Sequence, residues 1–147
     1  MKRFLYISFL ILGTITNSNA QCSEILITYG KTQIGDASYI CDYKVVLDKS
    51  KKRKPAFANY KIKLEKDNLY RFTTVNDLAN ENPLIAKISD DYNVYAISFD
   101  DSKNKDKGGF DFLCKKTQNY YLTCFYKDGT EGCGAVLFSF VKTYSKY

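Results

Sequence analysis

Residues 110–141 read FDFLCKKTQNYYLTCFYKDGTEGCGAVLFSFV, and this stretch decides the fold class. It contains three runs rich in aromatic and β-branched residues, separated by two segments that read as turns. Such runs, bounded by turn residues, are typical of β-strands. The stretch therefore predicts the closing hairpin of an antiparallel β structure.

Asp128 and Gly129 lie between the last two runs. Asp-Gly in this setting is the strongest short-range signal for a two-residue hairpin turn, because both turn residues need a positive φ. Counting outward from such a turn places Cys124 opposite Cys133, with Cα atoms about 4.5 Å apart, a spacing compatible with a disulfide. Cys114 is the rival partner of Cys133, because period-two alternation also turns its side chain towards the core.

The first twenty residues predict an export signal. Lys2 and Arg3 are followed by an apolar run from Phe4 to Gly13, and then by the small residues that signal peptidase reads, ending at Ala20. The apolar run is shorter than the roughly 20 residues of a membrane-spanning helix, so no transmembrane segment is expected in the mature chain. The alternative is a lipoprotein acylated at Cys22.

Cleavage after Ala20 leaves 127 of the 147 residues, with 20 basic and 16 acidic side chains and a formal net charge of +4. This length suits one domain, residues 21–147, with a core of its own, and we expect a monomer. Because exported proteins keep disulfides, the five cysteines predict two bridges. One is Cys22–Cys41 and the other joins Cys133 to Cys114 or Cys124, which leaves one thiol free.

Alternating patterns predict about eight strands, at residues 39–47, 58–64, 69–75, 84–88, 92–99, 110–114, 120–126 and 133–141. Residues 23–30 read as a short helix ending at Gly30, or as an edge strand. Residues 100–109 read as a polar loop without regular structure. The fold class is therefore all-β: an antiparallel, jelly-roll-like β-sandwich of two sheets.

Three segments carry a resemblance to a known family: Leu64–Phe72 (LEKDNLYRF), Leu84–Ile88 with the following Asp90–Asn93 turn, and Phe110–Phe112 with Thr117–Leu122 (TQNYYL). They resemble the strand and turn elements of bacterial pre-peptidase C-terminal domains. The chain is also similar to small secreted bacterial proteins with Phe-x-Phe-x-Cys and Asp-Gly-x-x-Gly-Cys arrangements, here Phe110, Phe112, Cys114, Asp128, Gly129, Gly132 and Cys133. The resemblance implies a non-catalytic accessory β-sandwich, and it favours Cys114 as the partner of Cys133, leaving Cys124 free.

The chain contains no histidine. Its absence excludes Ser-His-Asp and Cys-His nucleophilic sites, ordinary zinc sites and histidine-ligated haem. A pair of carboxylates of the glycosidase type remains open, with candidates Asp90, Asp91, Asp100, Asp101, Asp111 and Glu131. Turn formation and solvation explain the adjacent aspartates better, because neighbouring side chains on an extended chain point in opposite directions.

Residues Asp100–Asp106 place oxygen ligands at alternate positions, as a calcium loop does. However, Lys105 stands where that loop requires glycine, so we predict no metal and no other cofactor. The basic cluster Lys49, Lys51, Lys52, Arg53 and Lys54 predicts a solvated loop or a contact with an anionic surface, either lipid head groups or acidic polysaccharide. Because the chain is exported, nucleic acid is not the expected partner.

These observations predict a secreted or periplasmic protein without catalytic residues, binding a protein or a glycan at the bacterial cell surface. Outward-facing tyrosines offer one way of stacking on a sugar. The alternatives are a small hydrolase that uses two carboxylates and a lipoprotein anchored in the envelope.

Overall fold

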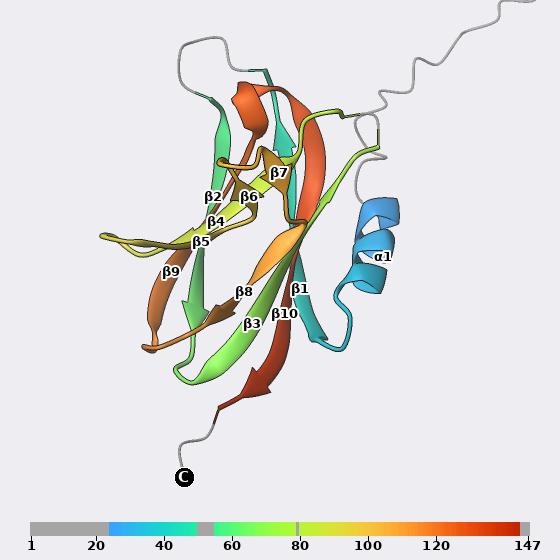
Figure 1. Ribbon diagram of the computed structural model, residues 1–147. Helices are drawn as coiled ribbons and strands as arrows, with labels where there is room; N and C mark the ends of the chain where they lie inside the picture. Colours follow the sequence, from blue (N-terminus) through green and yellow to red (C-terminus); the bar gives the residue numbers. More distant parts are fainter. Residues whose placement is uncertain (1–23, 50–54, 79, 145–147) are drawn as a thin grey trace, which may run out of the picture.

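Two antiparallel sheets of four strands pack face to face in the computed structural model of the protein (Figure 1). The structure describes residues 24–49, 55–78 and 80–144. Sheet A has the order β1 (Ser38–Leu47), β10 (Gly132–Thr143), β3 (Asn68–Asn76) and β8 (Gly109–Leu113). Sheet B has the order β2 (Phe57–Leu64), β9 (Gln118–Tyr126), β4 (Leu84–Ser89) and β5 (Val94–Ile97). Helix α1 (Glu24–Gln33) packs on β3 and β10 of sheet A.

The connections between the eight long strands alternate between the two sheets, except in the β4–β5 hairpin. Counted along the chain, the long strands of sheet A are the first, eighth, third and sixth, and those of sheet B are the second, seventh, fourth and fifth. This interleaved order is that of a jelly roll. It confirms the predicted all-β, two-sheet sandwich.

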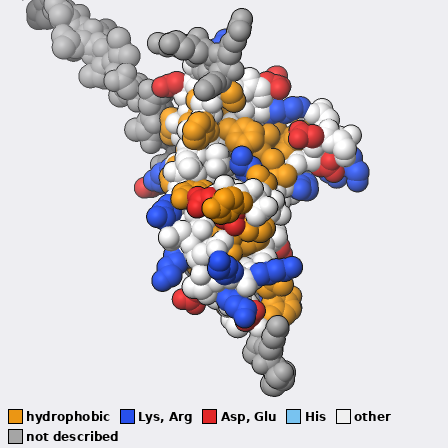
Figure 2. Space-filling view, turned by 90° about the vertical axis from the view of Figure 1, so that its left-hand side faces the viewer, with side chains coloured by type: hydrophobic (Ala, Val, Ile, Leu, Met, Phe, Trp, Pro, Cys, Tyr) orange, Lys and Arg blue, Asp and Glu red, His pale blue; other side chains and the backbone are white. Residues whose placement is uncertain are grey.

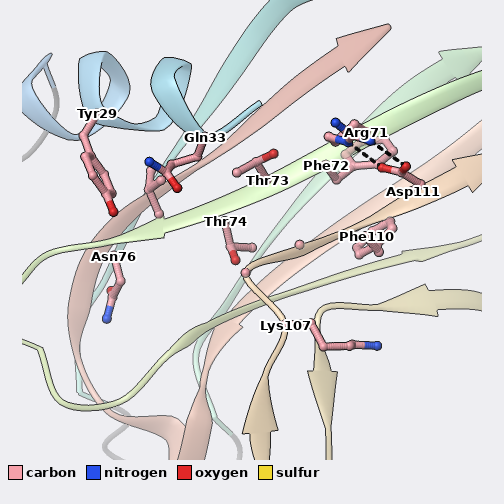
Figure 3. A pocket seen from close by; sticks show the side chains of 13 residues that line it. Tyr29, Gln33, Arg71, Phe72, Thr73, Thr74, Asn76, Lys107, Phe110 and Asp111 are labelled. Carbon is pink, nitrogen blue, oxygen red and sulfur yellow. Dashed lines mark hydrogen bonds and ion pairs between the residues drawn. The ribbon is translucent and has the colours of Figure 1, made fainter. Parts of the chain in front are cut away.

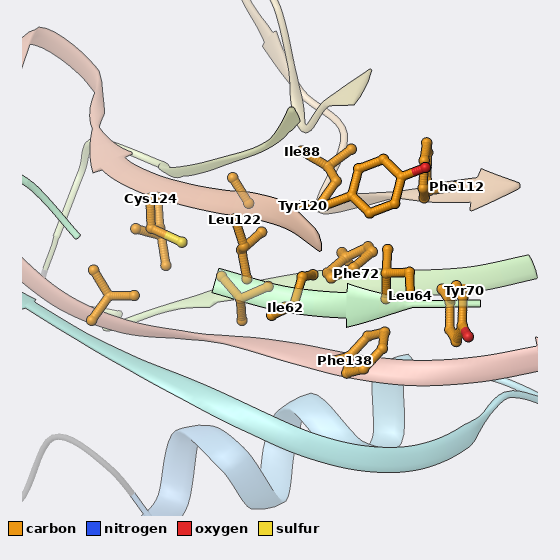
Figure 4. Packing of buried hydrophobic residues seen from close by; sticks show 14 of the residues in the cluster. Ile62, Leu64, Tyr70, Phe72, Ile88, Phe112, Tyr120, Leu122, Cys124 and Phe138 are labelled. Carbon is orange, nitrogen blue, oxygen red and sulfur yellow. The ribbon is translucent and has the colours of Figure 1, made fainter. Parts of the chain in front are cut away.

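The core lies between the sheets, where the alternating pattern of each strand turns its apolar side chains inward. In β2, Ile62 and Leu64 are buried, while Lys61 and Lys63, which alternate with them, are exposed. In sheet A, the rings of Phe72 (β3) and Phe138 (β10) stand opposite each other on the paired strands and stack with centroids 5.0 Å apart (Figure 4). In β2, period-two alternation alone is enough to define the inner face of the strand.

The predicted β9–β10 hairpin is wrong. β9 lies in sheet B and pairs with β2 and β4, whereas β10 lies in sheet A and pairs with β1 and β3. Asp128 and Gly129 do have the expected positive φ values of 60° and 67°. Their turn carries the chain from one sheet to the other, instead of folding it back on its neighbour.

The structure also corrects the predicted disulfides, because Cys41, Cys114 and Cys124 are free thiols. Cys114 follows the end of β8, next to the last residues of β10, since Leu113 pairs with Leu69 and Leu69 pairs with Lys142. Cys133 lies at the other end of β10, nine residues from Lys142 and therefore about 30 Å away along the strand. Neither Cys114–Cys133, Cys124–Cys133 nor Cys22–Cys41 is therefore formed, and Cys22 lies outside the described residues.

Helix α1 continues past Gly30, the residue expected to end it. Gly30 is buried against sheet A, where a Cβ would lie 2.4 Å from Leu137 Cδ1 and 3.2 Å from Val75 Cγ1. The glycine therefore permits a close approach of helix and sheet and does not terminate the helix. No helix in the described part of the chain is long and apolar enough to cross a membrane.

The strand predicted at residues 92–99 is interrupted at Ser98. The Ser98 backbone N–H donates to Ala86 O (2.9 Å), and its hydroxyl oxygen accepts from the Ala86 N–H (2.9 Å), so a side chain replaces part of the strand ladder. Beyond it, β6 (Phe99–Asp100) and β7 (Lys105–Asp106) form a small hairpin. The polar stretch 100–109 therefore has more regular structure than expected.

Candidate functional site

Edge strands β5 of sheet B and β8 of sheet A border a groove of about 510 Å³, called here the β5–β8 groove. In Figure 1 the β4–β5 turn projects from the left side of the molecule, above the connection from β8 to β9. The groove is bounded by residues of these segments: Asp90, Tyr95, Ala96, Asp111, Phe112, Leu113, Lys115, Lys116, Gln118 and Tyr120. The sandwich is thus hollowed along one of its open sides.

Three aromatic rings form the apolar part of the groove. Phe112 and Tyr120 pack edge to face with centroids 5.3 Å apart and are almost fully buried (Figure 4). Tyr95 packs against both of them, at 5.6 and 5.8 Å, yet remains 46% exposed. The Tyr95 ring is therefore held from behind and open to solvent.

Asp90 fixes the position of Tyr95. Its Oδ1 accepts from the backbone N–H groups of Tyr92 (2.9 Å) and Asn93 (2.7 Å), which closes the β4–β5 turn. Its Oδ2 accepts from the Tyr95 hydroxyl (2.5 Å) and from Gln118 Nε2 (3.3 Å). These bonds to the charged form, first among them the one from Tyr95, lower the pKa of Asp90 to about 2.

Asp111 lies on the other side of the groove and is paired with Arg71. Arg71 Nε and Nη2 donate to its two carboxylate oxygens at 2.7 and 2.9 Å, in a bidentate pair. The hydrogen bond and charge of Arg71 lower the pKa of Asp111. A general acid must stay protonated near neutral pH, so neither Asp90 nor Asp111 has the electrostatic surroundings of one.

The groove thus contains two of the carboxylates singled out in the sequence, Asp90 and Asp111. Asp100 instead caps a turn, accepting from Ser102 N and Oγ and from Lys103 N, within the stretch compared with a calcium loop. Across the described residues, no group of three or more His, Cys, Asp or Glu side chains could hold a metal ion. Of the basic cluster, Lys49 is described and exposed, and the other four members lie outside the described residues.

A second hollow, of about 520 Å³, lies between α1 and the end of β3 and is called here the α1–β3 hollow (Figure 3). Tyr29 and Gln33 reach towards β3 from the helix, and Thr74 and Asn76 lie on the other side of that strand. Thr74 N donates to Gly108 O (3.0 Å), and β8 begins only at the next residue. The hollow therefore follows a strand edge that the described chain leaves uncovered.

The sequence did not single out Tyr95, Phe112, Tyr120, Gln118, Lys115 or Lys116 as site residues. Alternation could turn Phe112 and Tyr120 inward, but β5 and β8 belong to different sheets and come together only through the jelly-roll order. Compared with known proteins, the chain matches no family model, no curated protein and no solved structure.

Proposed function

We propose that this protein is an exported, non-catalytic β-sandwich that binds a glycan at the bacterial cell surface through the β5–β8 groove. The observation that carries the proposal is the Tyr95 ring, which is 46% exposed and packed from behind by Phe112 and Tyr120. An aromatic face already fixed in place suits the C–H face of a sugar ring, because little conformational entropy is lost on binding. Gln118 and the polar rim supply hydrogen-bonding groups for hydroxyls.

Two further features support this proposal over a hydrolase that uses two carboxylates. Asp90 and Asp111 line one groove, but both have a lowered pKa, so both are ionised at neutral pH. Glycoside hydrolysis by a carboxylate pair needs one protonated member to act as the acid. The first twenty residues support export to the periplasm or the medium.

The α1–β3 hollow is the competing location for the same activity. It offers one exposed ring, Tyr29, together with the hydroxyl and amide groups of Thr73, Thr74 and Asn76. Among the described residues, no aromatic ring packs against Tyr29 as Phe112 and Tyr120 pack against Tyr95, so stacking on Tyr29 would lose more conformational entropy. We therefore place the glycan in the β5–β8 groove.

A glycan array followed by calorimetric titration of the best ligand tests this proposal with three matched variants. We expect Tyr95→Ala to weaken binding about tenfold or more, because loss of the stacking face removes roughly 1.4 kcal/mol. Tyr92→Ala is the control, because Tyr92 is 91% exposed on the neighbouring turn and does not line the groove. Tyr29→Ala tests the other hollow. Loss of binding in Tyr29→Ala but not in Tyr95→Ala would move the site, and no glycan binding by the unmodified protein would refute the function.

A further inference from the structure

We propose that the glycan bound in the β5–β8 groove is acidic, a polysaccharide whose sugars carry carboxylate or sulfate groups; this inference rests on the proposed function. It follows from the different states of the charged groups around the groove. The acids are already engaged with groups of the protein itself, whereas the two lysines are not.

Both carboxylates of the groove already accept hydrogen bonds from other groups of the protein. Asp90 accepts four hydrogen bonds, from two backbone N–H groups, the Tyr95 hydroxyl and Gln118. Asp111 is bound through both oxygens by Arg71, whose positive charge balances it. Neither carboxylate therefore needs a ligand, and neither is left as an uncompensated acceptor for a sugar hydroxyl.

Lys115 and Lys116 also line the groove, and both are exposed. Among the described residues neither forms an ion pair; the neighbouring Lys66 pairs weakly with Asp67, at 3.9 Å. With Asp111 balanced by Arg71, the two lysines outweigh the one remaining negative charge, that of Asp90, and leave the groove with a net positive charge. Figure 2 looks onto sheet B from outside and shows lysine and arginine side chains gathered over its lower half.

The backbone that carries these lysines is fixed. Lys116 O accepts from the Tyr120 hydroxyl (2.9 Å) and from Cys114 Sγ (3.2 Å), two groups of the buried core. Thr117 Oγ1 accepts from the Lys66 N–H (2.9 Å), which ties the same connection to the β2–β3 turn. Tyr120 therefore serves both as a ring of the groove and as an anchor for the backbone of the lysines, so their side chains start from a fixed position beside the ring.

An acidic sugar matches this combination of groups. Its ring can lie on Tyr95, while its carboxylate or sulfate meets the ammonium of Lys115 or Lys116. Lysine acts as a mobile point charge and tolerates several orientations of an anion, which suits a polymer with repeated acid groups. Because these charges are exposed, the attraction weakens as salt is added.

The test compares polygalacturonate with the same polymer after complete methyl esterification, which keeps the sugar ring and removes the charge. Dextran sulfate and dextran form a second pair, and vesicles containing phosphatidylglycerol are a third probe. The double variant Lys115→Ala/Lys116→Ala is matched by Lys61→Ala/Lys63→Ala, which removes the same charge from exposed positions of β2 outside the groove. Affinity is measured by calorimetry at low and at physiological salt.

We expect the acidic member of at least one pair to bind at least tenfold more tightly than its neutral partner. The groove double variant should lose about tenfold in affinity at low salt and less at physiological salt, and the β2 double variant should change it less than twofold. Equal binding of acidic and neutral polymers, weakened by Tyr95→Ala, would overturn this inference and leave the proposed function standing. Binding to the vesicles alone, or to none of the probes, would overturn both.

Discussion

Among single residues, two adjacent glycines at the start of β8 show how differently the same residue type can be used. Both have positive φ, 68° at Gly108 and 139° at Gly109. A Cβ at Gly109 would lie 2.2 Å from Phe72 O and 3.0 Å from Thr73 Cα, whereas a Cβ at Gly108 would meet nothing within 4 Å. Gly109 is therefore required by the pairing of β8 with β3, and Gly108 only by its own backbone conformation.

Gly109→Ala should consequently destabilise the protein much more than Gly108→Ala. We expect a loss of about 3 kcal/mol or more at Gly109, since the strand pair must separate, and about 1 kcal/mol at Gly108 for the left-handed conformation alone. Urea unfolding of the two variants checks this. Equal losses would mean that β8 can shift away from β3 without cost.

Asp90 gives a pH dependence at the same scale. Its pKa is about 2 in the folded protein, below its ordinary value near 3.9, chiefly because of the hydrogen bond from Tyr95. A group with a lowered folded-state pKa stabilises the fold fully above its unfolded pKa and loses that contribution as the pH falls through its folded pKa. The window for Asp90 therefore runs from about pH 4 down to about pH 2.

Tyr95→Phe should raise the pKa of Asp90 while keeping the ring of the groove. Carboxyl titration by NMR measures the shift, and the stability difference from the unmodified protein should be largest above pH 4 and vanish towards pH 2. Tyr92→Phe is the control, because Tyr92 bonds Asp90 through its backbone N–H. A stability difference that stays constant across this window would show that the hydroxyl acts through packing and not through Asp90.

Among the elements, α1 is attached to the sandwich by two kinds of contact. Its apolar face, with Leu26 and Ile27, packs on Val75, Ala135 and Leu137 of sheet A. Arg71 of β3 also donates to Ile34 O (3.0 Å), just past the end of the helix, while it binds Asp111 of β8. One guanidinium thus joins the end of α1, β3 and β8.

Arg71→Lys should loosen this junction, because an ammonium cannot bind Asp111 through two parallel bonds and reach Ile34 as well. We expect a loss of about 1–2 kcal/mol in unfolding free energy and faster amide exchange near the C-terminal end of α1. Asp36→Asn is the matched control, because the Asp36 side chain is 86% exposed and contacts Arg71 at 3.3 Å. It should change stability by less than about 0.5 kcal/mol. Unchanged exchange in Arg71→Lys would assign the attachment of α1 to its apolar face alone.

The sequence predicts which segments form strands better than it predicts which strands pair with each other. Alternation in stretches such as Phe57–Leu64 defines both a strand and its buried face, because side chains alternate across every pleated strand. The Asp128-Gly129 turn has the expected positive φ values, but a local turn does not determine which sheet the next strand joins. That choice depends on how the whole set of strands closes around one core, and no short stretch contains it.

For the molecule as a whole, the candidate site could not be predicted from the sequence either, because it also depends on the strand order. Tyr95 and Phe112 come from edge strands of different sheets and meet only because the jelly roll brings those two edges to the same side. A sequence pattern can mark each ring as part of a strand, but the groove is a property of the strand order. The absence of histidine reduced the kinds of catalytic and metal site that the chain could contain. The position of the candidate groove became visible only in the fold.

The last prediction concerns the disulfide pattern of the whole chain and rests on the proposed export. Cys41, Cys114 and Cys124 are free thiols, and Cys133 is not among them. Burial raises the pKa of the Cys124 thiol to about 12, which makes it unreactive. Within one chain, Cys22 is then the remaining partner for Cys133, so we predict a Cys22–Cys133 bridge in the exported protein.

Such a bridge would close a loop of about 110 residues and constrain the unfolded chain, with a stabilisation of up to about 4–5 kcal/mol in the chain-entropy model. Peptide mapping without reduction should recover Cys22 joined to Cys133, together with pyroglutamate at Gln21. Cytoplasmic expression without the first twenty residues should give the reduced, less stable form, because that compartment keeps thiols reduced. An acylated Cys22 would contradict the bridge and favour the anchored lipoprotein, while Cys133 linked to Cys114 would contradict the strand order itself, since the jelly roll places Cys114 at the other end of β10.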